Sequence, residues 1–517
     1  MGEQDRLERA EAVYRACRVT DRLFAMNPYL PQQNFYSQQL RALALVEVLS
    51  ELQLQEGWRS VVVVGAGIAG RTLAAAFSAV GANVRLVEAR ERPFERYRNA
   101  QHRELHPNII FWPYQDPVPA TALPFLNWAQ SSASDVTENL DQEWQVSFGP
   151  KVEIVIDEAL AIRACDDDVR IDLKTSGTIC ADMCVLAMGF GDEKSIEGIK
   201  SAGYWSPDGL PINDNNVMVS GSGDGGLIDI LAPIFGVHVT RAAHRLAVAL
   251  ADSPLRQDIL ETEKKRAERL IPGTRDSEDD CVFYTKVAVP PGAVREIEGL
   301  RAADDVLAAR KVTLLHSSTS PYSFTAAPIN KLLMAHFSNA PRQIVKTIKG
   351  SLQTNGAKNE AVCDDGTSYS LDPPCAFEKV LLRHGAHPGI AAVLSRDELD
   401  ALRDQAELNP QAAMIEGYNL NLYKWGPRGM GKSSVRPHAM PKSVRRALWN
   451  IGLAYMIDMQ IGPIGPGTFD GSRDIVVELS IDDQRKADEL RLFPLRIGPA
   501  KVKAGRRVFR RNRPDEE

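Results

Sequence analysis

The sequence predicts an α/β protein built around a parallel sheet, with a second sheet of the same kind and a helical N-terminal extension. Three observations support this fold class. Residues 61–64 are consecutive valines that run into a G-x-G-x-x-G turn, and a helical stretch and another strand follow. Residues 216–220 form a second apolar strand that runs into a second turn of the same form. Residues 1–57 carry hydrophobic residues at helical spacing.

The first glycine turn has the pattern of a dinucleotide-binding loop. Its valine strand is typical of a strand buried on both faces of a parallel sheet. In such a loop the first glycine allows a tight turn, the second lets a pyrophosphate approach the backbone, and the third lets the helix pack on the strand. The N–H groups at the helix N-terminus would bind the phosphates. We therefore expect cofactor contacts from Gly65, Ala66, Gly67, Ile68, Ala69 and Gly70.

An acidic residue follows where such a fold binds ribose. Residues 83–87 form the next strand, which ends at Glu88, about twenty residues after the glycines. Its carboxylate would accept hydrogen bonds from the ribose hydroxyls, and the adjoining Ala89 and Arg90 are included in the expected site. The alternative is a glycine-rich turn without a ligand in an ordinary βαβ unit.

Composition and charge narrow the class of protein. Hydrophobic residues make up 44% of the chain and charged residues 25%, as in soluble globular proteins. The formal net charge of −6 argues against nucleic acid as the main partner. The seven cysteines lack the spacing of metal ligands and suggest a reducing compartment. No apolar run approaches the ~20 residues that span a bilayer, and the charged start of the chain is not typical of a signal peptide. We expect a cytoplasmic protein with no membrane partner and no metal site.

The first 57 residues are expected to form helices separated by a break at 27–31. One interpretation is a helical cap packed on the first sheet. The other is an arm that joins two copies of the chain into a homo-oligomer. The sequence does not separate these two interpretations.

The segment after Glu88 is rich in arginine, histidine, proline and aromatic residues and has no clear periodicity. In a dinucleotide fold such a segment often crosses the bound cofactor, so its loop residues can carry function. Arg103 and His106 are therefore the candidate catalytic residues, expected to approach the cofactor or the substrate. The alternative is that the aromatic residues belong to the core and the arginines face solvent.

Short strands follow from residue 151. The pattern predicts an antiparallel meander from strands at 152–156, 159–163 and 169–173, separated by polar turns. A further apolar strand at 179–186 leads into an Ala-x-Gly turn at 187–189, where the backbone can again approach a ligand.

This order of features resembles the FAD-binding domain of the glutathione-reductase-like flavoprotein superfamily: a glycine turn, a terminal glutamate, a β-meander and an Asp-x-h-h-h-Ala-x-Gly turn. The resemblance covers about residues 58–245, and Met188 stands where the superfamily commonly has threonine. It implies a Rossmann-like FAD-binding domain with a three-layer ββα arrangement. It also implies that FAD contacts the first glycine turn and Glu88, and that the backbone at Val152 faces the adenine. The implied contacts include Ala187 and Gly189.

The second glycine turn, at 221–226, allows three interpretations. In flavoproteins with two dinucleotide domains an Ala-x-Gly turn shortly precedes a turn of this kind, so a second Rossmann-like NAD(P) domain would begin here. Residues 237–240 would be its next strand, and Arg241 after it would suit the 2′-phosphate of NADPH. Alternatively the Gly-Asp pair at 223–224 holds the ribityl chain of FAD, or the turn binds nothing. Pro233 lies where the helix should continue, which weighs against the first interpretation. The expected contacts are Gly221, Gly223, Asp224, Gly226 and Arg241.

These features divide the chain into five expected parts. They are a helical extension (1–57), the first part of the FAD-binding domain (58–210), an NAD(P)-binding or FAD-completing segment (211–290), a substrate or C-terminal region (291–500) and a basic tail (501–517). Within the fourth part the sequence predicts strands at 311–315 and 379–383, a helix at 329–334, a surface or lid loop at 424–433 and a Gly/Pro-rich bend at 461–467.

Several kinds of chemistry lack support in the sequence. No closely spaced cysteine pair stands beside the first glycine turn, so a disulfide reductase is not expected, and there is no H-E-x-x-H or G-x-S-x-G motif. With FAD, NADPH and no thiol relay, the resemblance implies a monooxygenase that acts on a small organic substrate through a flavin hydroperoxide. One alternative is an FAD-dependent oxidase or dehydrogenase of an amine, amino acid or alcohol. Another is a non-catalytic binding or assembly module.

Overall fold

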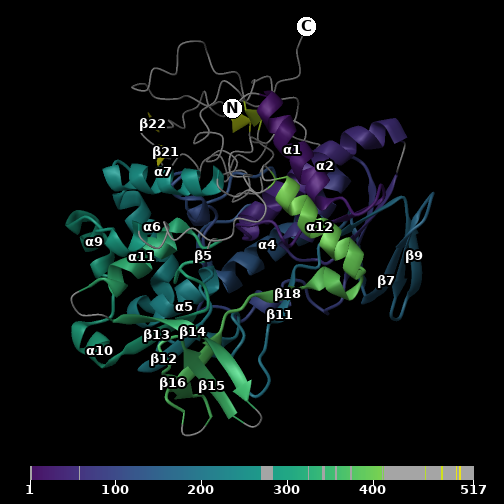
Figure 1. Cartoon of the computed structure of the whole chain (residues 1–517). Helices are drawn as coiled ribbons and strands as arrows, with labels where there is room; N and C mark the ends of the chain where they lie inside the picture. Colours follow the sequence, from purple (N-terminus) through teal and green to yellow (C-terminus); the bar gives the residue numbers. More distant parts are fainter. Residues whose placement is uncertain are drawn as a thin grey trace. The chain divides into compact units, whose positions relative to one another are not determined.

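The computed structural model describes most of the chain up to residue 412 (Figure 1). The described ranges are 3–56, 59–268, 283–323, 325–340, 344–355, 358–372, 375–409 and 412, with four residue pairs at 460–461, 479–480, 496–497 and 500–501. Two compact units are present. The first comprises Met1–Ser78, Ala82–Ala120 and Trp128–Asn419, and the second Ala79–Gly81, Thr121–Asn127 and Leu420–Glu517.

In the second unit the described residues of its last segment form two short antiparallel pairs. These are β19 (Gln460–Ile461) with β20 (Leu479–Ser480), and β21 (Arg496–Ile497) with β22 (Ala500–Lys501). The loop expected at 424–433, the rest of the bend at 462–467 and the tail beyond residue 501 lie outside the described residues.

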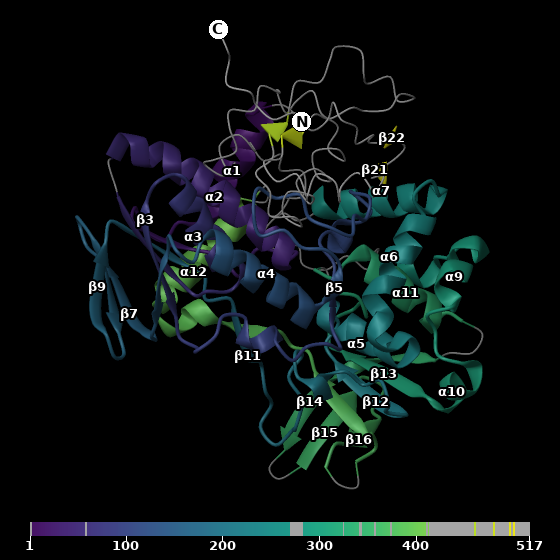
Figure 2. The same ribbon diagram turned by 180° about the vertical axis from the view of Figure 1, so that it is seen from behind.

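The first glycine turn belongs to a five-stranded parallel sheet with the order β1-β10-β2-β3-β6. The strands are β1 (Leu23–Ala25), β10 (Met183–Leu186), β2 (Ser60–Val64), β3 (Asn83–Glu88) and β6 (Glu153–Ile156). The four valines of β2 are at most 4% exposed, which confirms the predicted buried strand. The helix α3 (Ile68–Ala79) follows the turn and returns the chain to β3, so the unit is the expected Rossmann-like β-α-β (Figure 2).

An antiparallel meander follows, but with different strands from those predicted. It consists of β7 (Ala159–Ala164), β8 (Val169–Leu173) and β9 (Gly177–Ala181). The strand expected to open the meander is β6, which instead pairs in parallel with β3 in the first sheet. The crossover that makes this pairing possible is α4 (Ala133–Ser147), whose N-terminus is capped by the Ser132 side chain. Without this crossover the strand at 153–156 could pair only with its neighbours along the chain, which is why the pattern predicts it in the meander.

The apolar stretch at 179–186 is two strands rather than one. Asp182 separates β9 from β10, and its carboxylate accepts hydrogen bonds from the N–H groups of Arg59 and Ser60, both at 2.8 Å. These bonds satisfy the backbone at the start of β2. Asp182 therefore fixes the point at which the chain leaves the meander and enters the first sheet.

The N-terminal segment contains the two predicted helices and one strand that was not predicted. The helices are α1 (Glu3–Cys17) and α2 (Phe35–Glu56), which pack against each other. Between them β1 joins the edge of the first sheet beside β10, and Met26 N donates to Leu186 O at 2.7 Å. The Asn27 side chain donates to Ala16 O and to Leu402 O of α12 (Arg396–Leu408), both at 2.7 Å. The contacts among α1, α2 and α12 favour the cap interpretation, whereas a homo-oligomer stays a prediction.

The second glycine turn opens a separate sheet with the order β16-β15-β14-β13-β12-β17. The parallel strands are β17 (Lys379–Leu382), β12 (Asn216–Ser220), β13 (Lys311–His316) and β14 (Val345–Asn355), and the antiparallel ones β15 (Lys358–Cys363) and β16 (Ser368–Ser370). The helices α5 (Asp224–Phe235) and α11 (Pro328–Ser338) pack on it. The strands and the helix predicted at 311–315, 379–383 and 329–334 are confirmed, and chain on both sides of residue 290 contributes to one sheet.

The strand predicted at 237–240 is wrong. Residues Gly236–His238 form a short 3-10 helix, and α6 (Val239–Ala249) follows it directly. Val239, Ala242, Ala243 and Leu246 are buried along one face of α6, so burial outweighs the local strand propensity of the β-branched residues. By length and composition the helical run Asp224–Ala249 could cross a membrane, but 67% of its apolar window is buried inside the protein.

Two short strands carry the chain between the two sheets. β11 (Phe190–Glu193) leaves the first sheet after the Ala-x-Gly turn, and β18 (Ala386–Pro388) returns from the second. The two strands pair antiparallel, so the outward and returning chain lie side by side. The remaining elements are β4 (Glu104–Leu105), β5 (Ser131–Ser132), α7 (Pro254–Glu268), α9 (Pro291–Glu298), α10 (Asp304–Ala309) and 3-10 turns at Glu95–Tyr97, Ile109–Phe111, Pro207–Gly209 and Gly389–Ala392.

Candidate functional site

The first glycine turn forms a cradle at the carboxyl end of β2. Gly65 has φ +102° and donates its N–H to Val87 O at 2.7 Å, and a Cβ there would lie 2.5 Å from Ala187 O. A Cβ on Gly70 would overlap Gly65 O, so this glycine keeps α3 close to β2. A Cβ on Gly67 would meet nothing within 4 Å, so the backbone faces open space there. This arrangement fits the approach of a pyrophosphate.

Glu88 closes the adenosine side of the cradle. Its Oε2 accepts from Ala66 N at 2.8 Å and its Oε1 from Arg90 N at 3.0 Å. A carboxylate has about four acceptor positions, so two are left for ribose hydroxyls. The side chains of Ala66, Ile68 and Ala69 are buried, so these residues would contact a cofactor through their backbone. Ala89 and Arg90 are exposed beside Glu88.

The Ala-x-Gly turn lies at the same edge of the first sheet. Ala187 N donates to Val64 O at 2.7 Å, and Gly189 has φ +65° with no neighbour near its Cβ position. Gly389 N donates to Gly189 O at 2.8 Å, which brings the returning chain to this turn. The carboxyl ends of β2, β3 and β10 thus place all the predicted first-site residues except Val152 together.

Val152 is at the wrong edge of the sheet. It precedes β6 at the amino end of that strand, whereas Ile156 at the carboxyl end pairs with Glu88. The Val152 N–H donates to Phe148 O at 3.0 Å, and its side chain is buried. The residue beside Glu88 is Asp157, whose N–H donates to Glu88 O at 2.8 Å. The position of Val152 depends on where β6 begins, and the sequence pattern does not define that boundary.

The second glycine turn repeats the geometry of the first. Gly221 has φ +122° and donates its N–H to Leu315 O at 3.0 Å, and a Cβ there would collide with Arg383 O. A Cβ on Gly226 would overlap Gly221 O, and one on Gly223 would meet nothing within 4 Å. A second cradle of the same form therefore lies at the carboxyl end of β12 and fits a second pyrophosphate.

Asp224 does not face the first cradle. Its Oδ1 accepts hydrogen bonds from Ala327 N and from the Asn330 side chain, both at 2.8 Å. The carboxylate therefore lies at the start of α11, a helix that packs on the second sheet. Burial raises the pKa of Asp224 above its ordinary value. These contacts do not support the interpretation in which Asp224 holds the ribityl chain of FAD.

Arg241 is not at the end of a strand. It lies on α6, and its Nη2 donates to Glu104 Oε1 at 2.7 Å. The prediction that it meets the 2′-phosphate depended on a strand at 237–240, which is absent. The strand beside β12 is β13, and it ends at His316. Burial lowers the pKa of His316, whose Nδ1 contacts Ser318 O at 3.0 Å.

Arg103 and His106 do not approach the first cradle either. Arg103 is 3% exposed and donates to Asp229 Oδ1, to Tyr204 O and to Gly209 O. His106 is 5% exposed, and its Nε2 lies 2.8 Å from Nδ1 of His244 on α6. Their prediction as catalytic residues is therefore not supported.

The segment around them belongs to the core of the second sheet. Ile109 and Trp112 are in that sheet's hydrophobic core, and Phe111 and Trp112 are fully buried. The alternative that the aromatic residues are core residues is confirmed at these positions. Its packing on α6 and α11 accounts for the apolar residues at 109–112.

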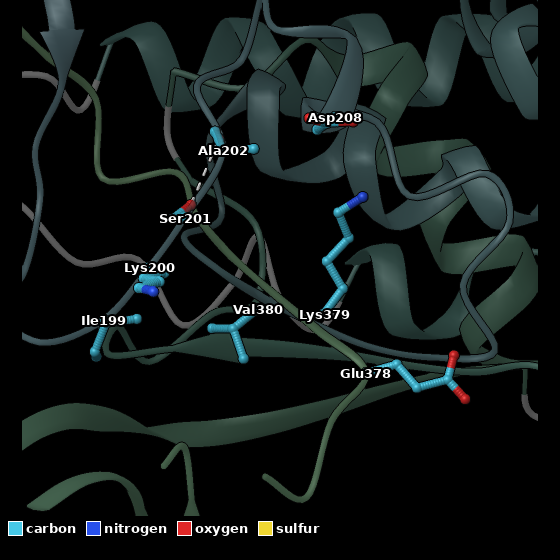
Figure 3. A pocket seen from close by; sticks show the side chains of 8 residues that line it. All are labelled: Ile199, Lys200, Ser201, Ala202, Asp208, Glu378, Lys379 and Val380. Carbon is cyan, nitrogen blue, oxygen red and sulfur yellow. Dashed lines mark hydrogen bonds between the residues drawn. The ribbon is translucent and has the colours of Figure 1, made fainter. Parts of the chain in front are cut away.

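A pocket of about 560 Å³ lies elsewhere on the second sheet (Figure 3). Its lining residues are Ile199, Lys200, Ser201, Ala202, Asp208, Glu378, Lys379 and Val380. Lys379 and Val380 begin β17, so the pocket is at the amino end of that strand, and the second cradle is beyond its carboxyl end. The pocket is therefore separate from the glycine turn.

The described cysteines form no disulfide. Cys17, Cys165, Cys180, Cys184, Cys363 and Cys375 are free. Burial raises the pKa of Cys17 to about 11, and it raises the pKa of Cys184 as well. Within the described ranges there is also no group of three or more side chains suited to hold a metal ion.

Comparisons with known proteins agree with the first cradle. A family model described as pyridine nucleotide-disulphide oxidoreductase matches residues 25–110, which include the first glycine turn and Glu88. The match supports a relationship of this part of the chain to FAD- and NAD(P)-dependent oxidoreductases. No curated protein matches the chain.

Solved structures share a distant likeness with the chain. A bacillithiol disulfide reductase from Staphylococcus aureus is 12% identical, with 65% of this chain and 80% of that chain covered and a TM-score of 0.36. Thioredoxin reductase from Lactococcus lactis is 12% identical, with 69% and 98% covered and a TM-score of 0.37. A flavin-containing monooxygenase from Stenotrophomonas maltophilia is 13% identical, with 65% and 81% covered and a TM-score of 0.32.

Proposed function

We propose that the protein is an FAD-dependent oxidoreductase that takes its reducing equivalents from NADPH, and specifically a monooxygenase of a small organic substrate. The observation that carries the proposal is the pair of glycine cradles of the same geometry, each at the carboxyl end of the parallel strands of its own sheet. The proposal includes a cytoplasmic location and neither nucleic acid nor a membrane as partner.

The first cradle would hold FAD. The open backbone at Gly67 would face the pyrophosphate, and Glu88 would accept hydrogen bonds from the adenosine ribose. The Ala187 turn at the same edge would contact the cofactor through its backbone. When bound, FAD would supply the transfer of hydride and the reaction with oxygen, while the protein supplies position and excludes water.

The second cradle would hold the nicotinamide dinucleotide, with Gly223 at its pyrophosphate. The strand beside this turn ends in His316 followed by Ser317 and Ser318, with no carboxylate among them. An acidic residue at this place binds the free ribose hydroxyls of NADH and would repel a 2′-phosphate. Lys349 is paired in register with His316 on β14, and its charge is balanced by Asp364 at 3.0 Å. The missing carboxylate at the end of β13 is therefore the feature that favours NADPH over NADH.

The cysteines favour a monooxygenase over a disulfide reductase. A reductase that passes electrons through thiols needs a pair of cysteines close enough to bond. All six described cysteines are free, and Cys17 and Cys184 are buried with raised pKa values. A raised thiol pKa is the opposite of what a reactive cysteine needs, so Cys17 and Cys184 do not fit a thiol relay.

The decisive experiment is anaerobic mixing of the purified, flavin-loaded protein with NADPH. NADPH should bleach the flavin absorbance, NADH should do so more slowly, and readmitted oxygen should restore the absorbance. A small aromatic disulfide reagent should not be reduced. A colourless protein that cannot be reconstituted with FAD, or a flavin that NADPH leaves oxidised, would contradict the proposal.

A further inference from the structure

Arg103, Asp229 and Arg383 form a buried cluster, which we call the arginine clamp. Arg103 Nη1 donates to Asp229 Oδ1 and Arg383 Nε donates to Asp229 Oδ2, both at 2.5 Å. Their side chains are 3%, 0% and 2% exposed. One carboxylate is thus shared by two arginines, and each of its oxygens accepts a charge-assisted hydrogen bond.

The three residues come from separate parts of the chain. Arg103 lies in the segment between β3 and α4 of the first fold, directly before β4. Asp229 is on α5, the helix that follows the second glycine turn, and Arg383 directly follows β17. The clamp therefore ties the first fold to the helix and the strand on either side of the second cradle.

The other donors of both arginines hold the linker between β11 and β12. Arg103 donates to Tyr204 O at 2.9 Å and to Gly209 O at 3.0 Å. Arg383 donates to Ala202 O at 3.0 Å and to Gly209 O at 2.9 Å. The Tyr204 ring lies 3.7 Å from the Arg103 guanidinium carbon, within the range of a cation–π contact. Each of the three guanidinium nitrogens of Arg103 thus has a partner inside the protein.

The clamp also touches the second glycine turn. A Cβ on Gly225 would lie 3.3 Å from the Tyr204 ring and 3.8 Å from Arg383 Cδ. A Cβ on Gly226 would lie 3.7 Å from Arg383 Cβ, and one on Gly221 would collide with Arg383 O. The turn thus rests directly on clamp residues, and a shift of Arg383 would move its support.

The first fold has apolar residues at the corresponding positions. Ala187 corresponds to Arg383, because each donates its N–H at 2.7 Å to the last residue of the strand before the glycine turn. Leu73 corresponds to Asp229, because each lies three residues after the third glycine of its turn. Ala187 is 6% and Leu73 0% exposed. The buried ion pair of the first fold, Arg71 with Asp141 at 2.7 Å, lies at other positions. A cradle of the same form is thus built without charges at the positions of Arg383 and Asp229, so the charges at these two positions serve something other than the shape of the turn.

We propose that the arginine clamp positions the second glycine turn for the nicotinamide dinucleotide and holds it in register with the first fold. This inference rests on the proposed NADPH site. Buried ion pairs seldom increase net stability, but removing one partner leaves an uncompensated charge, so the pairs fix one arrangement against others. Arg103, Asp229 and Arg383 are positioning residues, and none of them touches the reacting atoms.

Asp229→Asn tests the proposal, because it keeps the shape of the side chain and removes its charge. The control is Asp116→Asn in the segment that carries Arg103, where an exposed carboxylate pairs with Arg256 at 2.8 Å. Flavin content, thermal midpoint and the NADPH dissociation constant of the oxidised protein are measured for each. Asp229→Asn should keep its flavin and bind NADPH about tenfold more weakly or worse. Asp116→Asn should stay within about twofold of the parent protein.

Hydrogen exchange without any nicotinamide separates this inference from the proposed function. Amides at 216–230 should exchange at least about tenfold faster in Asp229→Asn, because the turn has lost part of its support. If the parent protein does not bind NADPH but Asp229→Asn still exchanges faster, the NADPH site is overturned, and the role of the clamp in holding the turn is supported. Unchanged exchange together with an unchanged dissociation constant would overturn the clamp.

A second variant covers the case in which Asp229→Asn does not fold. Arg103→Lys keeps a cation for Asp229 but cannot also bond Tyr204 O and Gly209 O. With normal flavin content it should raise the NADPH dissociation constant about threefold. A constant equal to that of the parent protein, or a loss of FAD in step with the loss of NADPH, would overturn the positioning role.

Discussion

His316 occupies in the second sheet the position that Glu88 occupies in the first. The first glycine of each turn donates its N–H to the carbonyl of the residue that precedes Glu88 or His316: Gly65 to Val87 O at 2.7 Å, and Gly221 to Leu315 O at 3.0 Å. Each residue ends the strand beside its glycine turn. The two cradles therefore differ in the side chain that would meet the ribose, a carboxylate in one and an imidazole in the other.

His316→Asp should reverse the preference between the two nicotinamides. A carboxylate would repel the 2′-phosphate of NADPH and accept hydrogen bonds from the ribose hydroxyls of NADH. A charge-assisted bond contributes about 1.5–3 kcal/mol, so NADPH should bind roughly 10- to 100-fold more weakly while NADH binds at least as well. Fluorescence titration of both dinucleotides gives the two dissociation constants.

Arg241→Ala is the control variant for His316→Asp, because the sequence pattern alone predicts that Arg241 binds the 2′-phosphate of NADPH. Its guanidinium pairs with Glu104 on the exposed side of α6. The ratio of the two dissociation constants should stay as in the parent protein. A ratio changed by Arg241→Ala and not by His316→Asp would refute the assignment.

Alanine at two glycines of the first turn should have different effects. A Cβ at Gly67 meets no protein atom, so Gly67→Ala should leave the thermal midpoint of the apoprotein unchanged and abolish flavin retention. A Cβ at Gly70 overlaps Gly65 O, so Gly70→Ala should destabilise the apoprotein itself, by about 1–3 kcal/mol or more. Thermal unfolding of the flavin-free proteins separates the two effects. Equal midpoints for both variants would mean that the first cradle is arranged differently.

Asp157 should contribute to stability only above a low pH. Hydrogen bonds from Ser176 and from the backbone N–H groups of Glu158 and Thr175 lower the pKa of Asp157 to about 2. Because the folded state holds the charged form, this contribution is complete above the ordinary value of 3.8 and is lost as the pH falls toward 2. Asp157→Asn should flatten the dependence of stability on pH between 4 and 2, measured by urea unfolding. An unchanged slope over that window would disprove the contribution.

A chain that begins at residue 35 should lose stability and flavin together. The deletion removes α1 and β1, so the edge of β10 and the Leu402 side of α12 lose their cover. The thermal midpoint should fall and flavin content should drop, as read by unfolding and absorbance. If residues 1–34 were instead an oligomerisation arm, light scattering would show a smaller assembly with an unchanged midpoint.

The parts of the fold that the sequence predicts are those whose signal is local. The valine strand, the glycines and Glu88 lie within one short stretch, and each has its own physical reason to be there. Strands β13 and β17 and helix α11 were likewise visible as apolar runs with polar ends. Patterns within short stretches of the sequence are therefore enough to predict both glycine cradles.

The parts that were missed depend on partners far apart in the chain. The partner strand β13 comes after five α-helices in the described part of the chain, whereas the β-branched stretch at 237–240 is the nearest in sequence and therefore has the local pattern of that strand. The partners of Arg103 cannot be predicted from the sequence, because Asp229 and Arg383 lie more than a hundred residues away along the chain. β1 has only three residues, too few for a strand pattern. The strand at 311–315 is predicted from its pattern, but the pattern does not show that it pairs with β12, so the position of His316 beside the second turn does not follow from sequence.

The pairing of β11 with β18 bears on the order in which the chain can fold as it leaves the ribosome. All strands of the first sheet have been synthesised once the chain reaches Leu186. Gly389, which contacts the Ala-x-Gly turn, and Leu402, which lies on the helix packed against α1, are synthesised only after the whole second sheet. Until then the nascent first fold exposes the apolar surface that Ile390, Leu394 and Leu402 later bury. That interval is when the growing chain most needs a chaperone to shield it.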